Sequence, residues 1–129
     1  MEELLTERII GCALKIHNTL GAGFLEKVYE NAIVHELSKN GFHVEKQKPI
    51  PVFYDGVCVG DYIADIIVEG KVLLELKAFT GFSEEHTAIC LNYLRCTSIP
   101  VCLLINFGRP RLQFKRLVGE SYRVQDAPI

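Results

Sequence analysis

Three charged residues interrupt two apolar segments that a small globular chain would normally bury. The segments, residues 64–68 and 72–78, are rich in β-branched residues and leucine and flank a short polar turn, which predicts a β-hairpin. Both are almost continuously apolar, as is typical of strands covered on both faces. Asp65, Glu75 and Lys77 would therefore lie in a buried setting, where a charge is costly unless it is paired or binds a metal. This hairpin is the strongest indication of function in the sequence.

The register of the hairpin decides whether these charges meet. Glu75 and Lys77 must share a face, because side chains alternate along a strand. A three-residue loop at 69–71 would place Asp65 directly opposite Glu75, with Cβ atoms about 5 Å apart. A two-residue loop would send Asp65 to the other face. We therefore predict a loop of odd length or a bulge.

Length and composition indicate one soluble globular domain. The chain has 129 residues, 49% of them hydrophobic and 23% charged; we expect a single domain over 1–129, with its core at about 5–118 and a polar tail at 119–129. No segment approaches the roughly 20 apolar residues of a membrane span, and the acidic start is unlike a signal peptide. We therefore expect a cytoplasmic protein that does not associate with a membrane. Five cysteines without metal-like spacing are expected as free thiols. The net charge of −2 gives no global attraction to nucleic acid, so any such binding needs a local basic patch.

Hydrophobic periodicity predicts two helices, a group of antiparallel strands, a third helix and two final strands. The expected elements are helices at 3–20, 24–40 and 83–96, with Ser83 as N-cap of the third, and strands at 42–47, 52–54, 57–68, 72–78, 101–105 and 111–118. Prolines at 49 and 51 exclude a central strand there and favour a connection or an edge. This order indicates an α/β fold (an α+β mixed sheet) with helices flanking the sheet.

Asp65 and Glu75 would present two carboxylates from adjacent strands, and such oxygen-rich pairs suit Mg²⁺ or Mn²⁺. Lys77 would lie beside the metal, where it could orient or help deprotonate a water, or neutralise charge on a phosphate oxygen. The alternative is a buried ion pair between Lys77 and a carboxylate without a metal. Glu-x-Lys by itself does not decide between the two.

Four blocks of sequence carry a resemblance to a known family. They are Gly-x-x-Glu-x-x-Tyr at Gly23, Glu26 and Tyr29, the segment 47–56, the set Asp65 with Glu75-Leu76-Lys77, and the segments 92–94 and 103–108. Together they resemble the PD-(D/E)XK nuclease superfamily and, within it, the small GxxExxY group.

The resemblance implies a restriction-endonuclease-like core, ordered α-β-β-β-α-β around a central mixed sheet, and metal-dependent hydrolysis of phosphodiester bonds in DNA or RNA. It implies that Asp65, Glu75 and the backbone carbonyl of Leu76 hold Mg²⁺ or Mn²⁺, with Lys77 as the catalytic lysine. Glu26 matches a helical acid that completes the metal site and the catalytic set in such enzymes.

Further residues are candidates for contact with the substrate. Gln47 is expected to line the same cleft, and Tyr29 is a candidate that is more simply explained as a core residue with a polar partner for its hydroxyl. Members of the group usually carry Gln where this chain has Ile89, so His86 or Asn92 would have to supply that polar contact. The missing amide leaves open a catalytically inactive nuclease-fold module for binding or assembly. A homodimer would serve either function, because so small a domain has few ways to grip a duplex alone.

Overall fold

Five strands form one mixed sheet in the order β1-β2-β3-β4-β5, in a computed structural model that describes residues 2–78 and 84–119. Neighbouring strands are antiparallel except β3 and β4, which are parallel and are joined through α3. The elements are α1 (Glu2–Leu20), α2 (Glu26–Lys39), β1 (Val44–Tyr54), β2 (Val57–Val68), β3 (Val72–Lys77), α3 (Glu84–Arg95), β4 (Val101–Asn106) and β5 (Gln113–Val118). This arrangement confirms the predicted mixed sheet with flanking helices.

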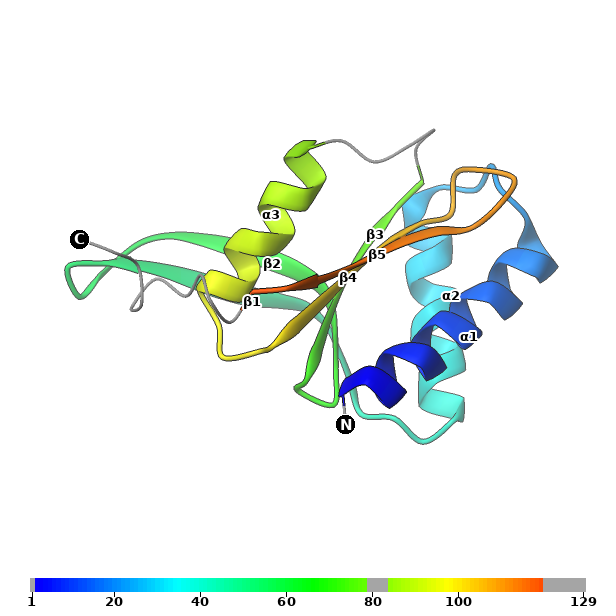
Figure 1. The fold of residues 1–129 in the computed structure, drawn as a ribbon, viewed down its shortest axis with the longest axis horizontal. Coiled ribbons are helices and arrows are strands. Elements are labelled where there is room, and N and C mark those ends of the chain that lie inside the picture. Colours follow the sequence, from blue (N-terminus) through cyan, green and yellow to red (C-terminus); the bar gives the residue numbers. More distant parts are fainter. Residues whose placement is uncertain (1, 79–83, 120–129) are drawn as a thin grey trace.

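The helices cover the two faces of the sheet, and each face has its own apolar core (Figure 1). α1 and α2 pack on one face through residues such as Ile9 and Ile33. α3 packs on the other face through residues such as Cys90 and Leu94. Every side chain of β4, which lies between β3 and β5, is buried, as is typical of a continuously apolar strand. Along the described part of the chain, no helix is both long and apolar enough to cross a membrane.

The predicted elements are observed with small changes at their ends. β1 runs unbroken from Val44 to Tyr54, where the sequence suggested two pieces around the prolines. Pro49 and Pro51 are tolerated because β1 is an edge strand, the place where a missing N–H is acceptable. β5 forms the opposite edge. The predicted N-cap, Ser83, lies outside the described residues, and the five cysteines are free, as expected.

The β2–β3 hairpin has the predicted register. Val68 pairs with Val72 across a loop of residues 69–71. Glu69 and Gly70 have φ angles of 55° and 64°, and the Lys71 N–H donates to the Val68 carbonyl over 2.9 Å. Gly70 accepts this left-handed conformation without the cost that a Cβ would bring. The odd loop length keeps Asp65 and Glu75 in opposed positions.

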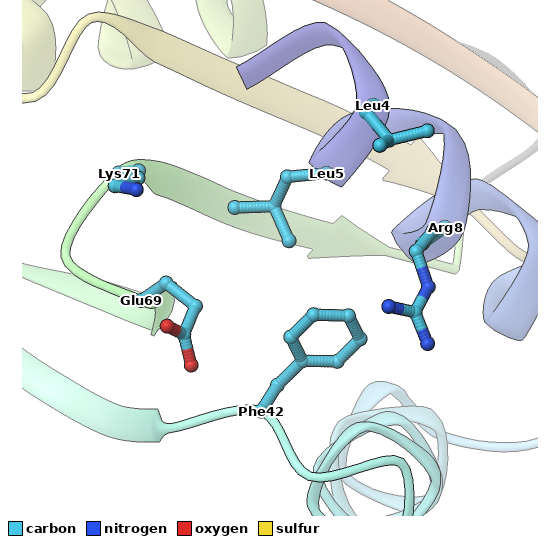
Figure 2. Close-up of a pocket in the computed structure, with 6 residues that line it drawn as sticks. All are labelled: Leu4, Leu5, Arg8, Phe42, Glu69 and Lys71. Carbon is cyan, nitrogen blue, oxygen red and sulfur yellow. The ribbon is translucent and has the colours of Figure 1, made fainter. Parts of the chain in front are cut away.

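The same turn borders a pocket of about 190 Å³ at the end of the sheet away from these carboxylates (Figure 2). Leu4, Leu5 and Arg8 of α1 line one side. Phe42 lies below them with the Arg8 guanidinium 4.6 Å from its ring centroid, and Glu69 and Lys71 of the turn close the other side. The charged residues of the hairpin thus lie in two separate groups, one in the turn and one at the far end of β3.

Candidate active site

Each of the two carboxylates of the hairpin accepts a hydrogen bond from the backbone of the opposite strand. Backbone pairing of β2 with β3 extends to Ile66 and Leu74. Beyond that pair, the two strands are linked by hydrogen bonds from backbone N–H groups to side-chain carboxylates. The Asp65 N–H donates to Glu75 Oε1 over 3.2 Å, and the Leu76 N–H donates to Asp65 Oδ2 over 2.8 Å. Asp65 is half-buried and Glu75 is only 5% exposed. Both acids therefore converge at the point where the strands part, as predicted from the loop length.

Burial makes these acids hard to ionise. It raises the pKa of Glu75 from 4.5 to about 8, with the charge of Asp65 as the next largest cause. Burial also raises the pKa of Asp65, against the opposing effects of the Leu76 N–H and the Lys77 charge. Two acids in one small space cannot both ionise cheaply without a nearby cation. Such perturbed pairs are typical of functional sites.

Lys77 supplies positive charge to this pair. It is half-buried at the end of β3, two residues after Glu75 on the same face of the strand. Its charge lowers the pKa of both acids, although less than burial raises it. The Lys77 carbonyl accepts the Phe107 N–H over 2.8 Å, which fixes the end of β3 against the chain that leaves β4. The charge of Lys77 therefore acts on the ionisation of both acids.

Glu26 approaches the same place from α2. It is the first residue of that helix, and its Oε2 accepts the Ala78 N–H over 3.4 Å, directly after β3. Its charge contributes to the raised pKa of Asp65 and Glu75. The helical acid predicted from the motif is thus brought to the end of β3.

In residues 2–78 and 84–119, no three His, Cys, Asp or Glu side chains gather closely enough to hold a metal ion. Glu26, Asp65 and Glu75 each turn an oxygen to a backbone N–H. The three acids thus border one place without forming a three-carboxylate cluster.

Comparison with known proteins decides the family. The family model described as PD-(D/E)XK nuclease superfamily matches residues 3–117, almost the whole described chain. The chain belongs to the PD-(D/E)XK nuclease superfamily. Neither a curated protein nor a solved structure matched it.

The Tyr29 hydroxyl closes the loop that carries Glu26 to the end of β3, beside Asp65 and Glu75. It donates to the Gly21 carbonyl over 2.5 Å and accepts the Phe24 N–H over 3.2 Å. Its ring is fully buried and stacks on Phe107, with centroids 4.5 Å apart and an interplanar angle of 9°. This placement favours the structural alternative for Tyr29 over contact with a substrate. The tyrosine positions the start of α2, and therefore Glu26.

Glu30 is a site residue that the sequence did not single out. It lies one turn after Glu26 on α2 and is 7% exposed. Gln47 of β1 donates its amide to both Glu30 oxygens over 3.2 and 3.1 Å, and Lys27 lies 3.4 Å from one of them. The Glu30 charge contributes to the raised pKa of Asp65. The i, i+4 spacing from Glu26 was the available signal, because it puts both acids on one side of the helix.

α3 places apolar side chains and one phenol on the side of the sheet that Glu75 faces. Tyr93 is 5% exposed and donates its hydroxyl to the Ile63 carbonyl over 3.0 Å. Burial raises its pKa, and the charges of Glu75 and Asp65 raise it further, so Tyr93 lies close to both acids. Ile89 packs against the apolar core on this face. His86 and Asn92 are partly exposed on the same helix.

Proposed function

We propose that this chain is a metal-dependent nuclease of the GxxExxY group that hydrolyses phosphodiester bonds of DNA or RNA. The observation that carries the proposal is the convergence of Asp65 and Glu75 beside Lys77, in a chain of the PD-(D/E)XK superfamily. The loop closed by Tyr29, which delivers Glu26, supports the assignment to the group. We further propose a cytoplasmic location, where five free cysteines would stay reduced.

The donor chemistry fits Mg²⁺ or Mn²⁺. Carboxylate and carbonyl oxygens are the ligands that these ions prefer, and Asp65, Glu75 and the Leu76 carbonyl would hold the ion, with Glu26 at its border. Burial and mutual repulsion raise the pKa of both acids, and a divalent cation would offset that cost. A bound ion of this kind polarises a phosphoryl oxygen and makes water a better nucleophile.

The chain's own side chains would supply the rest of the chemistry. Lys77 is the cation beside both acids, placed to orient a water or to stabilise negative charge on the scissile phosphate. Glu75, with a pKa of about 8, can hold a proton near neutral pH before a cation binds. Tyr93 lies on the α3 side of the acids and helps to keep bulk water from them, and Ile89 packs against the core on the same face.

A cleavage assay tests the proposal. Single-stranded and double-stranded DNA and RNA are incubated with the protein and Mg²⁺ or Mn²⁺, and the same metals are titrated by calorimetry. We expect cleavage that Lys77→Ala and Asp65→Asn abolish, and weaker metal binding by Asp65→Asn. Lys71→Ala is the matched control, because Lys71 is an exposed lysine at the far end of the same hairpin. Absence of both cleavage and metal binding in the wild type would refute the proposal.

A second function is favoured by one observation. Ile89 contributes an apolar side chain to the core where the superfamily group usually offers an amide, as a catalytically inactive nuclease-fold module would allow. Such a module would bind nucleic acid or a partner without cleaving. Ile89→Gln distinguishes the two functions: cleavage that appears only in this variant favours the inactive module, whereas wild-type cleavage removed by Lys77→Ala excludes it.

A further inference from the structure

The outer part of the β1–β2 hairpin extends beyond the rest of the sheet. β2 pairs with β3 only at residues 66–68, so residues 49–63 form a two-stranded projection that we call the arm. Figure 1 shows it reaching past the remaining strands. A two-stranded hairpin alone is marginally stable in water, and it gains stability when another surface packs on it. The arm therefore needs a covering surface.

Among residues 2–78 and 84–119, cover of the arm is limited to the inner part of one face. Ile50 and Tyr62 are paired in register, and they face α3: Ile50 is buried in the α3-side core, and Tyr62 meets Tyr93 edge to face with ring centroids 5.5 Å apart. The neighbouring pair, Pro49 with Ile63, points to the opposite face, because successive side chains alternate. Ile63 is 54% exposed. The remainder of the arm has no cover from the described residues.

Exposed apolar side chains concentrate on this arm. Six of the thirteen large hydrophobic residues that are exposed in the described chain belong to it: Phe53, Tyr54, Val57, Val59, Tyr62 and Ile63. These side chains alternate between the two faces of the arm, so each face exposes roughly 300 Å² of apolar surface, taking about 200 Å² for an aromatic and about 150 Å² for a Val or Ile side chain. A specific interface buries about 800 Å² per partner, of which a little over half is apolar, so one face of the arm supplies the greater part of the apolar surface that a dimer needs and polar side chains supply the rest.

Two features disfavour other occupants. The arm contains Asp55 and Asp61 but no Lys or Arg, so it lacks the cations with which proteins contact a phosphate backbone. Its outer edge contains Pro49 and Pro51, which have no N–H for an added strand. These features disfavour a phosphate backbone and an added strand, and they favour a protein that packs on the face of the arm.

We propose that the partner is a second copy of this chain, with the two arms packed face to face and antiparallel. The charges of the arm and its base are self-complementary in that orientation only. The tip carries Asp55 and the middle of the arm carries Asp61, which pairs with Pro51, whereas the base carries Lys46 and a Lys48 that pairs with Glu45 over 2.7 Å. Antiparallel packing brings the acidic tip of each copy to the basic base of the other. A parallel arrangement would oppose acid to acid.

The proposal does not depend on the nuclease chemistry, and it is tested by sedimentation. The wild type should dimerise reversibly at micromolar concentrations. Phe53→Glu should raise the dissociation constant about thirtyfold or more, as loss of a central apolar contact does. Phe114→Glu is the matched control, because Phe114 is 48% exposed on β5 at the other edge, and it should leave the dissociation constant within about threefold.

Charge reversal tests the orientation. A basic-arm variant (Asp55→Asn with Asp61→Lys) and an acidic-base variant (Lys46→Glu) should each dimerise about tenfold more weakly than the wild type. An equimolar mixture of the two should recover near wild-type affinity, because each tip then meets an opposite charge. All these positions are exposed, and circular dichroism verifies that each variant is folded.

Three outcomes would overturn the proposal. The first is a wild type that stays monomeric at every concentration. The second is a dimer that Phe114→Glu breaks and Phe53→Glu does not. The third is a mixture of the charge variants that associates no better than either alone. If a monomeric wild type binds nucleic acid and Phe53→Glu removes that binding, the arm contacts nucleic acid instead.

Discussion

The Glu75 carboxyl should make the protein less stable as pH rises. It is almost fully buried beside Asp65, and these two causes raise its pKa from 4.5 to about 8. An acid with a higher pKa in the folded chain than in the unfolded chain binds more protons when folded. Its favourable contribution is therefore complete below pH 4.5 and is lost as pH rises through about 8.

The size of the effect follows from the same values. At 1.36 kcal/mol per pKa unit, a rise from 4.5 to about 8 corresponds to an upper limit of about 5 kcal/mol. The free energy of unfolding should then fall by up to about 1.4 kcal/mol per pH unit between about pH 5 and 8. Because small domains have about 5–15 kcal/mol in total, this is a large share of the stability.

Glu75→Gln isolates this contribution. The amide oxygen of Gln can still accept the Asp65 N–H, while the ionisation is removed. Urea unfolding in the presence of a chelator, from pH 5 to 8, should show the variant gaining several kcal/mol over the wild type at the alkaline end and little at the acid end. Glu7→Gln, on the exposed side of α1, is the control for loss of one carboxylate. Parallel curves for wild type and Glu75→Gln would refute the assignment of the pH dependence to this carboxyl.

Three further changes follow from the same contacts. Mg²⁺ should raise the stability of the wild type most at alkaline pH and should release protons on binding, because it requires ionised acids. Calorimetry in buffers of different ionisation enthalpy counts those protons. A stabilisation by Mg²⁺ that does not depend on pH would contradict the site. Tyr29→Phe should lower the free energy of unfolding by about 1–2 kcal/mol in urea, while Tyr54→Phe, at an exposed tyrosine, should not; equal losses would contradict the closing role of the hydroxyl. Gln47→Leu should cost about 1–3 kcal/mol, because it leaves the buried Glu30 without its amide donors, and an unchanged urea midpoint would contradict that contact.

The hairpin could be predicted because its determinants are local. Turn residues at 69–71 and period-two alternation set the register, and the register brings Asp65 and Glu75 together. The helices and the order of the elements along the chain were accessible for the same reason, since they follow from periodicity and turn chemistry within short windows. The two prolines of β1 excluded a central strand and left a connection or an edge, of which the structure shows the edge. These features need no knowledge of distant contacts.

The burial of Glu30 could not be predicted in this way. On the helical pattern of α2 it lies off the centre of the apolar stripe, as an exposed acid would. In the structure, β1 approaches α2 there, and Gln47 contacts the carboxylate. The environment of Glu30 is therefore set by a strand that follows it by more than a dozen residues. Helical periodicity carries no information about that strand.

A change of face within the sheet explains how an acid can interrupt these apolar strands. In β2, Ala64 and Ile67 pack in the α3-side core while Ile66 packs on the α1–α2 side, so strict alternation fails at Asp65.

In β1 the alternation of faces also fails, at the position opposite Asp65. Val44 packs on the α1–α2 side and Ile50 on the α3 side, although both are even-numbered. Gln47 has a φ of 53°, and it lies between the Lys46–Ile66 and Lys48–Ala64 pairs, opposite Asp65. A left-handed conformation at a non-glycine residue costs of order 1–3 kcal/mol and tends to occur at functional sites. Here it reverses which face the following side chains point to, so that the apolar residues on either side of Gln47 and Asp65 fill the two cores. At the reversal itself, Asp65 meets Glu75 and the Gln47 amide meets Glu30.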